Sequence, residues 1–153
     1  MRINPFLTRR TKKPKQACKS DPQRHLVYWM ERKIAGWAIY QHADVEDLQR
    51  IADYVCRRYK VKRVSVVIEN KGDQRVFGWH VDNGIHLNAD FHGDNTAVLV
   101  HELAHYIADQ VLPSDESHGK EFVTIYGELL DMLNLFPLKL FFIMCDDHGV
   151  SYV

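Results

Sequence analysis

The sequence HELAH at residues 101–105 constrains the fold more than any other part of the chain. It lies within 95–112, where apolar residues recur every three or four positions and Pro113 follows, a pattern that predicts a helix. Positions four apart lie on the same face of a helix, so the two imidazoles of HELAH can reach one point. We therefore predict that this helix packs its apolar face on a core and turns its histidines toward a cleft.

The residue types at this spacing are those of a zinc site. Zinc binds neutral imidazole in roughly tetrahedral geometry, and a catalytic site uses three protein ligands and leaves the fourth position for water. His101 and His105 are therefore predicted to bind one zinc ion. Glu102 lies about 100° around the helix from His101, where it can act on a metal-bound water without binding the metal. The alternative is a helix with two incidental histidines.

A third ligand is expected after the loop 113–117, which would reverse the chain toward the motif. His118 follows His105 by thirteen positions and begins the next predicted helix. Glu121 and Glu128 are the competitors for the third ligand, because one class of HExxH peptidases uses a glutamate from the following helix as its third zinc ligand. We favour His118, and the choice among the three stays open at this point.

The rest of the chain divides into segments of helical and of strand periodicity. Two strand patterns flank the turn sequence Asp82-Asn83-Gly84, which is typical of a hairpin. The predicted helices are 25–41, 45–60, 95–112 and 119–134, the predicted strands are 63–69, 75–81 and 85–90, and an apolar run at 133–145 is predicted as a buried helix or strand. We therefore predict an α+β fold, in which a short, mostly antiparallel sheet packs on the HELAH helix beside flanking helices.

The formal net charge is zero, but the charges are unevenly distributed. Residues 1–75 hold 18 Lys and Arg against 8 Asp and Glu, whereas residues 76–153 hold 2 against 12. Residues 1–19 alone hold seven basic residues and no acid, which predicts a flexible arm over 1–20 and a single domain over 21–153. The arm is interpreted either as a solvated tail or as a weak contact to nucleic-acid phosphates.

The cysteines and the apolar segments indicate a compartment. Cys18, Cys56 and Cys145 form no CxxC pair and no disulfide framework, so we expect reduced thiols. No apolar run follows the basic N-terminus as it would in a signal peptide, and the run at 133–145 is too short to cross a bilayer. A cytoplasmic protein that does not enter a membrane is expected.

The sequence HELAH, followed after a short loop by HGKEF at 118–122, resembles the SprT-like (Spartan-type) zinc metallopeptidase domain. In that family HExxH precedes a third histidine in the context HG-[KP]-x-[FW]. The resemblance covers the order of helices and strands over 43–134, and its specific part is 98–122. It implies a small zincin-like domain. The implied zinc ligands are His101, His105 and His118, and the implied catalytic base is Glu102.

The function expected from these residues is the zinc-dependent hydrolysis of peptide bonds. A zinc-activated water would attack the carbonyl, Glu102 would act as general base, and Tyr126 or Tyr106 would stabilise the oxyanion. The alternative is a zinc-containing module that binds protein or nucleic acid with little or no turnover. SprT-like proteins often carry a Cys-rich zinc ribbon, and this chain has no second zinc motif, so the resemblance implies no DNA-linked role that depends on one.

The expected substrate is a protein or peptide that binds as an added strand along 85–90, which we place at the edge of the sheet. His86 and His92 could line the cleft there, although both are expected to be ordinary sheet or surface residues. The same expectation holds for His80.

Overall fold

The structure is a computed structural model of the chain, and it describes residues 19–34, 41–72 and 76–153. The predicted basic arm lies outside the described residues, apart from Lys19 and Ser20. The elements follow in the order α1 (Arg24–Ile34), α2 (Val45–Tyr59), β1 (Ser65–Glu69), β2 (Gly78–Val81), β3 (Gly84–Asn88), a 3-10 helix (Ala89–Phe91), α3 (Thr96–Val111), α4 (Lys120–Met132) and α5 (Leu138–His148). The α+β class predicted from the sequence is confirmed.

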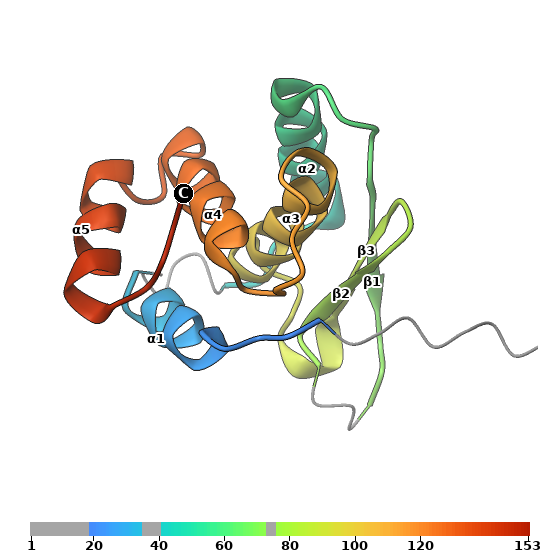
Figure 1. Cartoon of the computed structure of the whole chain (residues 1–153). Helices are drawn as coiled ribbons and strands as arrows, with labels where there is room; N and C mark the ends of the chain where they lie inside the picture. The colour runs from blue at the N-terminus through green and yellow to red at the C-terminus, as the bar shows by residue number, and fades with distance from the viewer. Residues whose placement is uncertain (1–18, 35–40, 73–75) are drawn as a thin grey trace, which may run out of the picture.

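The helices lie on one side of the sheet (Figure 1). α2 packs on β1, α3 packs on β2 and β3, and α4 packs on α3 farther from the sheet. Three apolar side chains of α3, those of Leu99, Leu103 and Ile107, are completely buried. α3 is therefore the central helix of the fold, and any side chain that it presents is held by the sheet and by α4 together.

The sheet has the strand order β1-β3-β2. β2 and β3 form the predicted hairpin and are antiparallel, and Asp82 has φ 51° in the turn between them. β1 pairs with the other side of β3, and this pairing is parallel. The prediction of a mostly antiparallel sheet is therefore wrong, because one of the two pairings is parallel. Alternating polarity identifies a strand, but it specifies neither the partner nor the direction of pairing.

β3 is the central strand of the sheet, although the sequence analysis placed 85–90 at the edge. Ile85 and Leu87 of this strand are completely buried. Because β1 and β2 occupy the two sides of β3, a peptide cannot add to it as a further strand. The edge strands within the described ranges are β1 and β2.

A side-chain cap fixes the beginning of α3. The Oδ1 atom of Asn95 accepts a hydrogen bond from the backbone N–H of Val98 at 2.9 Å, which satisfies one of the unpaired donors in the first turn. The helix confirms the prediction over 95–112. The chain then returns to α4, whose first turn follows Gly119.

The apolar run predicted over 133–145 provides most of α5. Phe141 and Cys145 are buried, whereas Leu140 and Ile143 on the same helix are 49% and 46% exposed. α5 is therefore a surface helix that packs one face on α4.

Two further observations concern the helices and the cysteines. Among the described helices, none combines the length and the apolar character that a membrane span requires. Cys56 and Cys145 are free, buried thiols, and Cys18 lies outside the described residues.

Candidate metal centre

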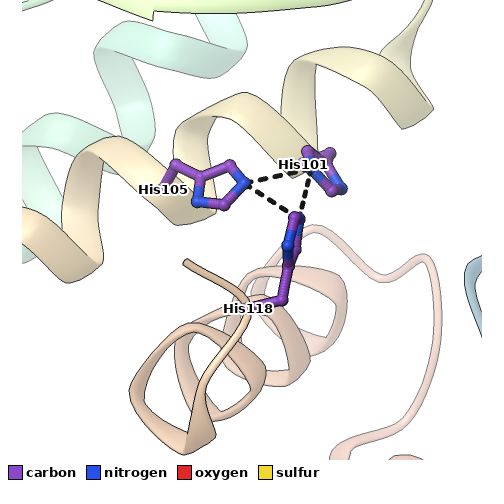
Figure 2. Close-up of side chains that lie close together, drawn as sticks. All are labelled: His101, His105 and His118. Carbon is purple, nitrogen blue, oxygen red and sulfur yellow. Dashed lines mark hydrogen bonds between the residues drawn. The ribbon is translucent and has the colours of Figure 1, made fainter. Parts of the chain in front are cut away.

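Three imidazoles converge between α3 and the segment that precedes α4. His101 and His105 project from consecutive turns of α3, and His118 reaches them from the other side (Figure 2). The Nε2 atom of His105 lies 3.1 Å from the Nε2 atoms of both His101 and His118, and the last two are 3.2 Å apart. Together they form a group that could hold a metal ion. The structure thus brings together the three histidines singled out in the sequence.

The triangle of nitrogen atoms has the size that a tetrahedral metal requires. With Zn–N bonds of about 2.05 Å, two nitrogen ligands of tetrahedral zinc are roughly 3.3 Å apart. The observed separations of 3.1 and 3.2 Å are close to this value. The three imidazoles therefore fit a zinc ion, or another divalent metal that accepts imidazole ligands.

Carboxylates from the N-terminal part of the chain contact the outer nitrogens of two imidazoles. Oε1 of Glu31 contacts Nδ1 of His101, and the two carboxylate oxygens of Asp21 lie 2.9 and 3.0 Å from Nδ1 of His118. Such contacts favour the tautomer with its proton on Nδ1, which leaves the lone pair of Nε2 for a metal. In that tautomer the converging Nε2 atoms are acceptors, and a shared cation would relieve their repulsion.

The environment of the site keeps most of its imidazoles neutral. Burial, and then the neighbouring His101 and His118, hold the pKa of His105 far below its usual range. Burial also lowers the pKa of His118, although Asp21 opposes this effect. Burial acts in the same direction on His101, but the carboxylates of Glu31, Glu102 and Asp21 together outweigh it and the pKa of His101 is raised. Two of the three imidazoles are therefore held in the neutral form that binds a metal.

Glu102, the predicted base, lies on the side of α3 that β2 covers. Its side chain is 11% exposed, and its Oε2 lies 3.9 Å from Nδ1 of His80. Nε2 of His80 lies 3.4 Å from Oδ2 of Asp109, and the ring of His80 stacks on that of His105, with 6.0 Å between centroids. The carboxylates of Asp109 and Glu102 raise the pKa of His80 to about 9. The predicted base thus lies beside an imidazole that was predicted to be an ordinary sheet or surface residue.

The glutamates that competed with His118 point elsewhere. Oε2 of Glu128 accepts a hydrogen bond from the hydroxyl of Tyr59 at 2.6 Å, so this carboxylate faces α2. Glu121 lies in the first turn of α4 and lines an open groove with Glu116. Within the described ranges, neither belongs to the group of close metal-binding side chains. The geometry therefore favours His118.

Tyrosines surround the histidines, but not in the arrangement expected. Tyr106 is 2% exposed, and its hydroxyl donates to a backbone carbonyl ahead of β1 at 2.8 Å, so the role predicted for it is wrong. Tyr126 is buried, with its ring centroid 6.5 Å from that of His101. Tyr28 of α1 also lies at the site, where its ring stacks on His101 with 5.6 Å between centroids and meets His118 edge-on at 5.1 Å. α1 therefore covers part of the site.

Within the described ranges, neither of the two histidines predicted as possible cleft residues belongs to the group of close imidazoles. His86 on β3 stacks on Trp79, with 5.2 Å between centroids, and its Nδ1 lies 2.9 Å from Glu69. His92 ends the 3-10 helix with φ 56°.

The residues that sequence reasoning missed are Asp21, Tyr28, Glu31 and His80. All four residues lie before the HELAH motif in the sequence, and no regular spacing from the motif could have pointed to them.

Comparisons of the chain with family models, with curated proteins and with solved structures found no match. The resemblance to SprT-like domains therefore rests on the residues of HELAH and HGKEF. What the site can do has to be argued from its geometry.

Proposed function

We propose that this protein is a zinc-dependent peptidase that hydrolyses peptide bonds in protein substrates. The observation that carries the proposal is the convergence of three Nε2 atoms, 3.1–3.2 Å apart, beside a helix in which Glu102 directly follows the first of the three histidines. A metal site with a purely structural role has no need of a carboxylate beside it. The resemblance of HELAH and HGKEF to the zincin-like SprT domain supports the same reaction.

Each side chain of the site has a part in this reaction. His101, His105 and His118 would hold the ion, and a bound zinc ion supplies Lewis acidity that makes water nucleophilic and polarises a carbonyl. Glu102 takes a proton from the attacking water and passes it to the leaving amine. Because the Glu102 side chain is only 11% exposed, few bulk waters compete for its carboxylate.

β2 is the strand that could accept the substrate. It is an edge strand within the described ranges, and it carries His80 beside Glu102. An extended peptide that adds to the free edge of β2 would gain main-chain hydrogen bonds close to the three imidazoles. Phe77, which directly precedes this strand, and Val81 at its end are 53% and 54% exposed and offer apolar contacts. We therefore infer an extended protein segment as the substrate.

A second candidate is a zinc-containing binding module with little or no turnover. It is favoured by the enclosure of the site, because the side chains of His101 and His118 are only 12% and 5% exposed. Tyr28 lies against both rings, which leaves less room for a substrate. The two candidates differ in one measurable property, which is turnover.

Metal analysis combined with a proteolysis assay tests the proposal. The full chain and its Glu102→Gln variant are purified without chelators, zinc is measured by mass spectrometry, and unfolded casein is offered as substrate. We expect about one zinc per chain in both proteins, and cleavage by the wild type alone. Glu121→Gln, which alters a glutamate outside the triangle, should still cleave. A zinc-loaded wild type without cleavage would favour the binding module, and a chain that neither retains nor takes up zinc would contradict both candidates.

A further inference from the structure

We propose that His80, held by Asp109, positions the carboxylate of Glu102. This inference rests on the proposed function, because it assigns the orientation of the general base to a residue outside the metal-binding triangle. His80 lies between two carboxylates, with Nδ1 3.9 Å from Oε2 of Glu102 and Nε2 3.4 Å from Oδ2 of Asp109.

Glu102 needs such a partner because it is little exposed and intrinsically mobile. A glutamate side chain has three rotatable bonds, and only a fixed orientation is useful to a general base. In the part of the chain that the structure describes, His80 is the one basic side chain with a nitrogen within 4.0 Å of the Glu102 carboxylate. Attraction between the imidazole and the carboxylate therefore selects one orientation of the carboxylate next to the three histidines.

The backbone of β2 is placed for this contact by a glycine. A Cβ atom added at Gly78 would lie 3.2 Å from Cγ of Glu102 and 3.0 Å from a methyl carbon of Val98, so a larger residue would have to push these side chains back and glycine favours the close approach of the strand to α3. Alternate residues of a strand point to the same face, so His80 projects toward α3 as well. The close approach at Gly78 thus brings the imidazole of His80 to the carboxylate of Glu102.

Asp109 completes the arrangement from the same helix. It follows Glu102 by seven positions, which is about two helical turns, so both carboxylates lie on the side of α3 that faces β2. One oxygen of Asp109 faces His80, and the other accepts a charged hydrogen bond from Lys19 at 2.8 Å. Asp109 is thereby held from two directions, and it orients His80 in turn.

The sheet also provides a matched control. His86 on β3 forms the same kind of pair, with Nδ1 2.9 Å from Oε1 of Glu69. Its ring stacks on Trp79, and it has no contact with the metal-binding histidines among the described residues. A substitution of His86 therefore removes a strand imidazole and a carboxylate partner without touching the proposed base.

The test compares His80→Phe, His80→Gln and Asp109→Asn with His86→Gln in the full chain. With casein peptide as substrate, His80→Phe should lower kcat about 10- to 100-fold, with KM and zinc content close to those of the wild type. His80→Gln keeps an N–H donor and should recover part of the loss, Asp109→Asn should have a smaller effect in the same direction, and His86→Gln should have none. Unchanged kcat in His80→Phe and His80→Gln would overturn the inference.

A second readout does not depend on turnover. In crystals of the zinc-free proteins, the carboxylate of Glu102 should keep one orientation in the wild type and in His86→Gln, should leave it in His80→Phe, and should keep it in part of the molecules in His80→Gln. If the zinc-loaded wild type proves inactive, the proposed function fails, and the orientation of Glu102 still decides this inference. An unmoved carboxylate in both His80 variants would overturn it.

Discussion

Nδ1 of His118 lies 2.9 Å from Oδ2 of Asp21, a residue 97 positions earlier in the chain. The other oxygen of Asp21 accepts a hydrogen bond from the backbone N–H of His118 at 3.2 Å. The carboxylate therefore holds both the ring and the backbone of the third imidazole. Without it, the ring could turn its Nε2 away from His101 and His105.

The first prediction follows from this pair. Asp21→Asn should lower the affinity for zinc about 10-fold or more, because the amide is a weaker acceptor and no longer fixes the proton on Nδ1 of His118. A competition titration with a fluorescent zinc chelator measures the change. Asp115→Asn alters an exposed carboxylate in the nearby loop and should bind zinc like the wild type. Equal affinities of all three proteins would show that Asp21 has no influence on the metal.

The second prediction concerns Glu128, the glutamate that competed with His118 in the sequence. Glu128→Gln should leave zinc affinity unchanged, because this carboxylate bonds the hydroxyl of Tyr59 at 2.6 Å. The substitution should lower the free energy of unfolding by about 1 kcal/mol, since a charged hydrogen bond becomes a neutral one. Zinc titration and urea unfolding measure the two effects, and Tyr59→Phe should show the same pattern. A tenfold loss of zinc affinity in Glu128→Gln, without such a loss in Tyr59→Phe, would instead show that Glu128 is a metal ligand.

The third prediction concerns the packing of α4 on α5. A Cβ atom at Gly127 would lie 2.5 Å from a ring carbon of Phe141, which is 1% exposed and has little room to move. Gly127→Ala should therefore destabilise the protein by about 1–2 kcal/mol, even though alanine favours a helix over glycine. Urea unfolding measures this loss. The double variant Gly127→Ala with Phe141→Leu should lose less free energy of unfolding than the two single variants lose together. Fully additive losses would contradict a clash between the two side chains.

The fourth prediction concerns pH and a pair remote from the metal centre. Nδ1 of His42 lies 2.5 Å from Oδ2 of Asp94, and this hydrogen bond raises the pKa of His42 above its usual value. The pair therefore stabilises the folded protein fully at pH values below the pKa of about 6.5 that His42 has in the unfolded chain. This stabilisation is lost as the pH rises through the higher pKa that His42 has in the folded protein. Urea unfolding at low and high pH should show a larger loss of stability for the wild type than for His42→Gln. The same pH dependence of stability in the wild type and in His42→Gln would contradict the prediction.

Local features of the fold could be predicted from the sequence because their causes lie close together in the chain. The helix over 95–112 follows from its apolar spacing and from Pro113 behind it. The β2–β3 hairpin follows from Asp82-Asn83-Gly84 in the same way. The partner of β1 has no local cause, because pairing with β3 depends on how α2 and the strands pack, and so the parallel pair was missed.

The same distinction applies to the metal centre. The pair His101 and His105 is local, and His118 could be singled out because a short loop returns the chain to the motif. Its carboxylate partners and His80 could not be found in this way, because folding alone brings α1 and β2 to the site. Glu128 remained a candidate in the sequence because its bond to Tyr59 is also a contact between distant segments.

The two carboxylates that contact the imidazoles come from 70 and 97 positions before their partners. Bringing such distant segments together costs chain entropy. An ion that binds more tightly when the carboxylates contact the imidazoles would stabilise the folded state against this cost. The affinity for the metal should therefore depend on whether the N-terminal segment is packed against the three imidazoles. A fragment that begins at α2 would retain every imidazole of the triangle and still lack both carboxylates. Such a fragment should hold the ion more weakly and exchange it faster than the full chain.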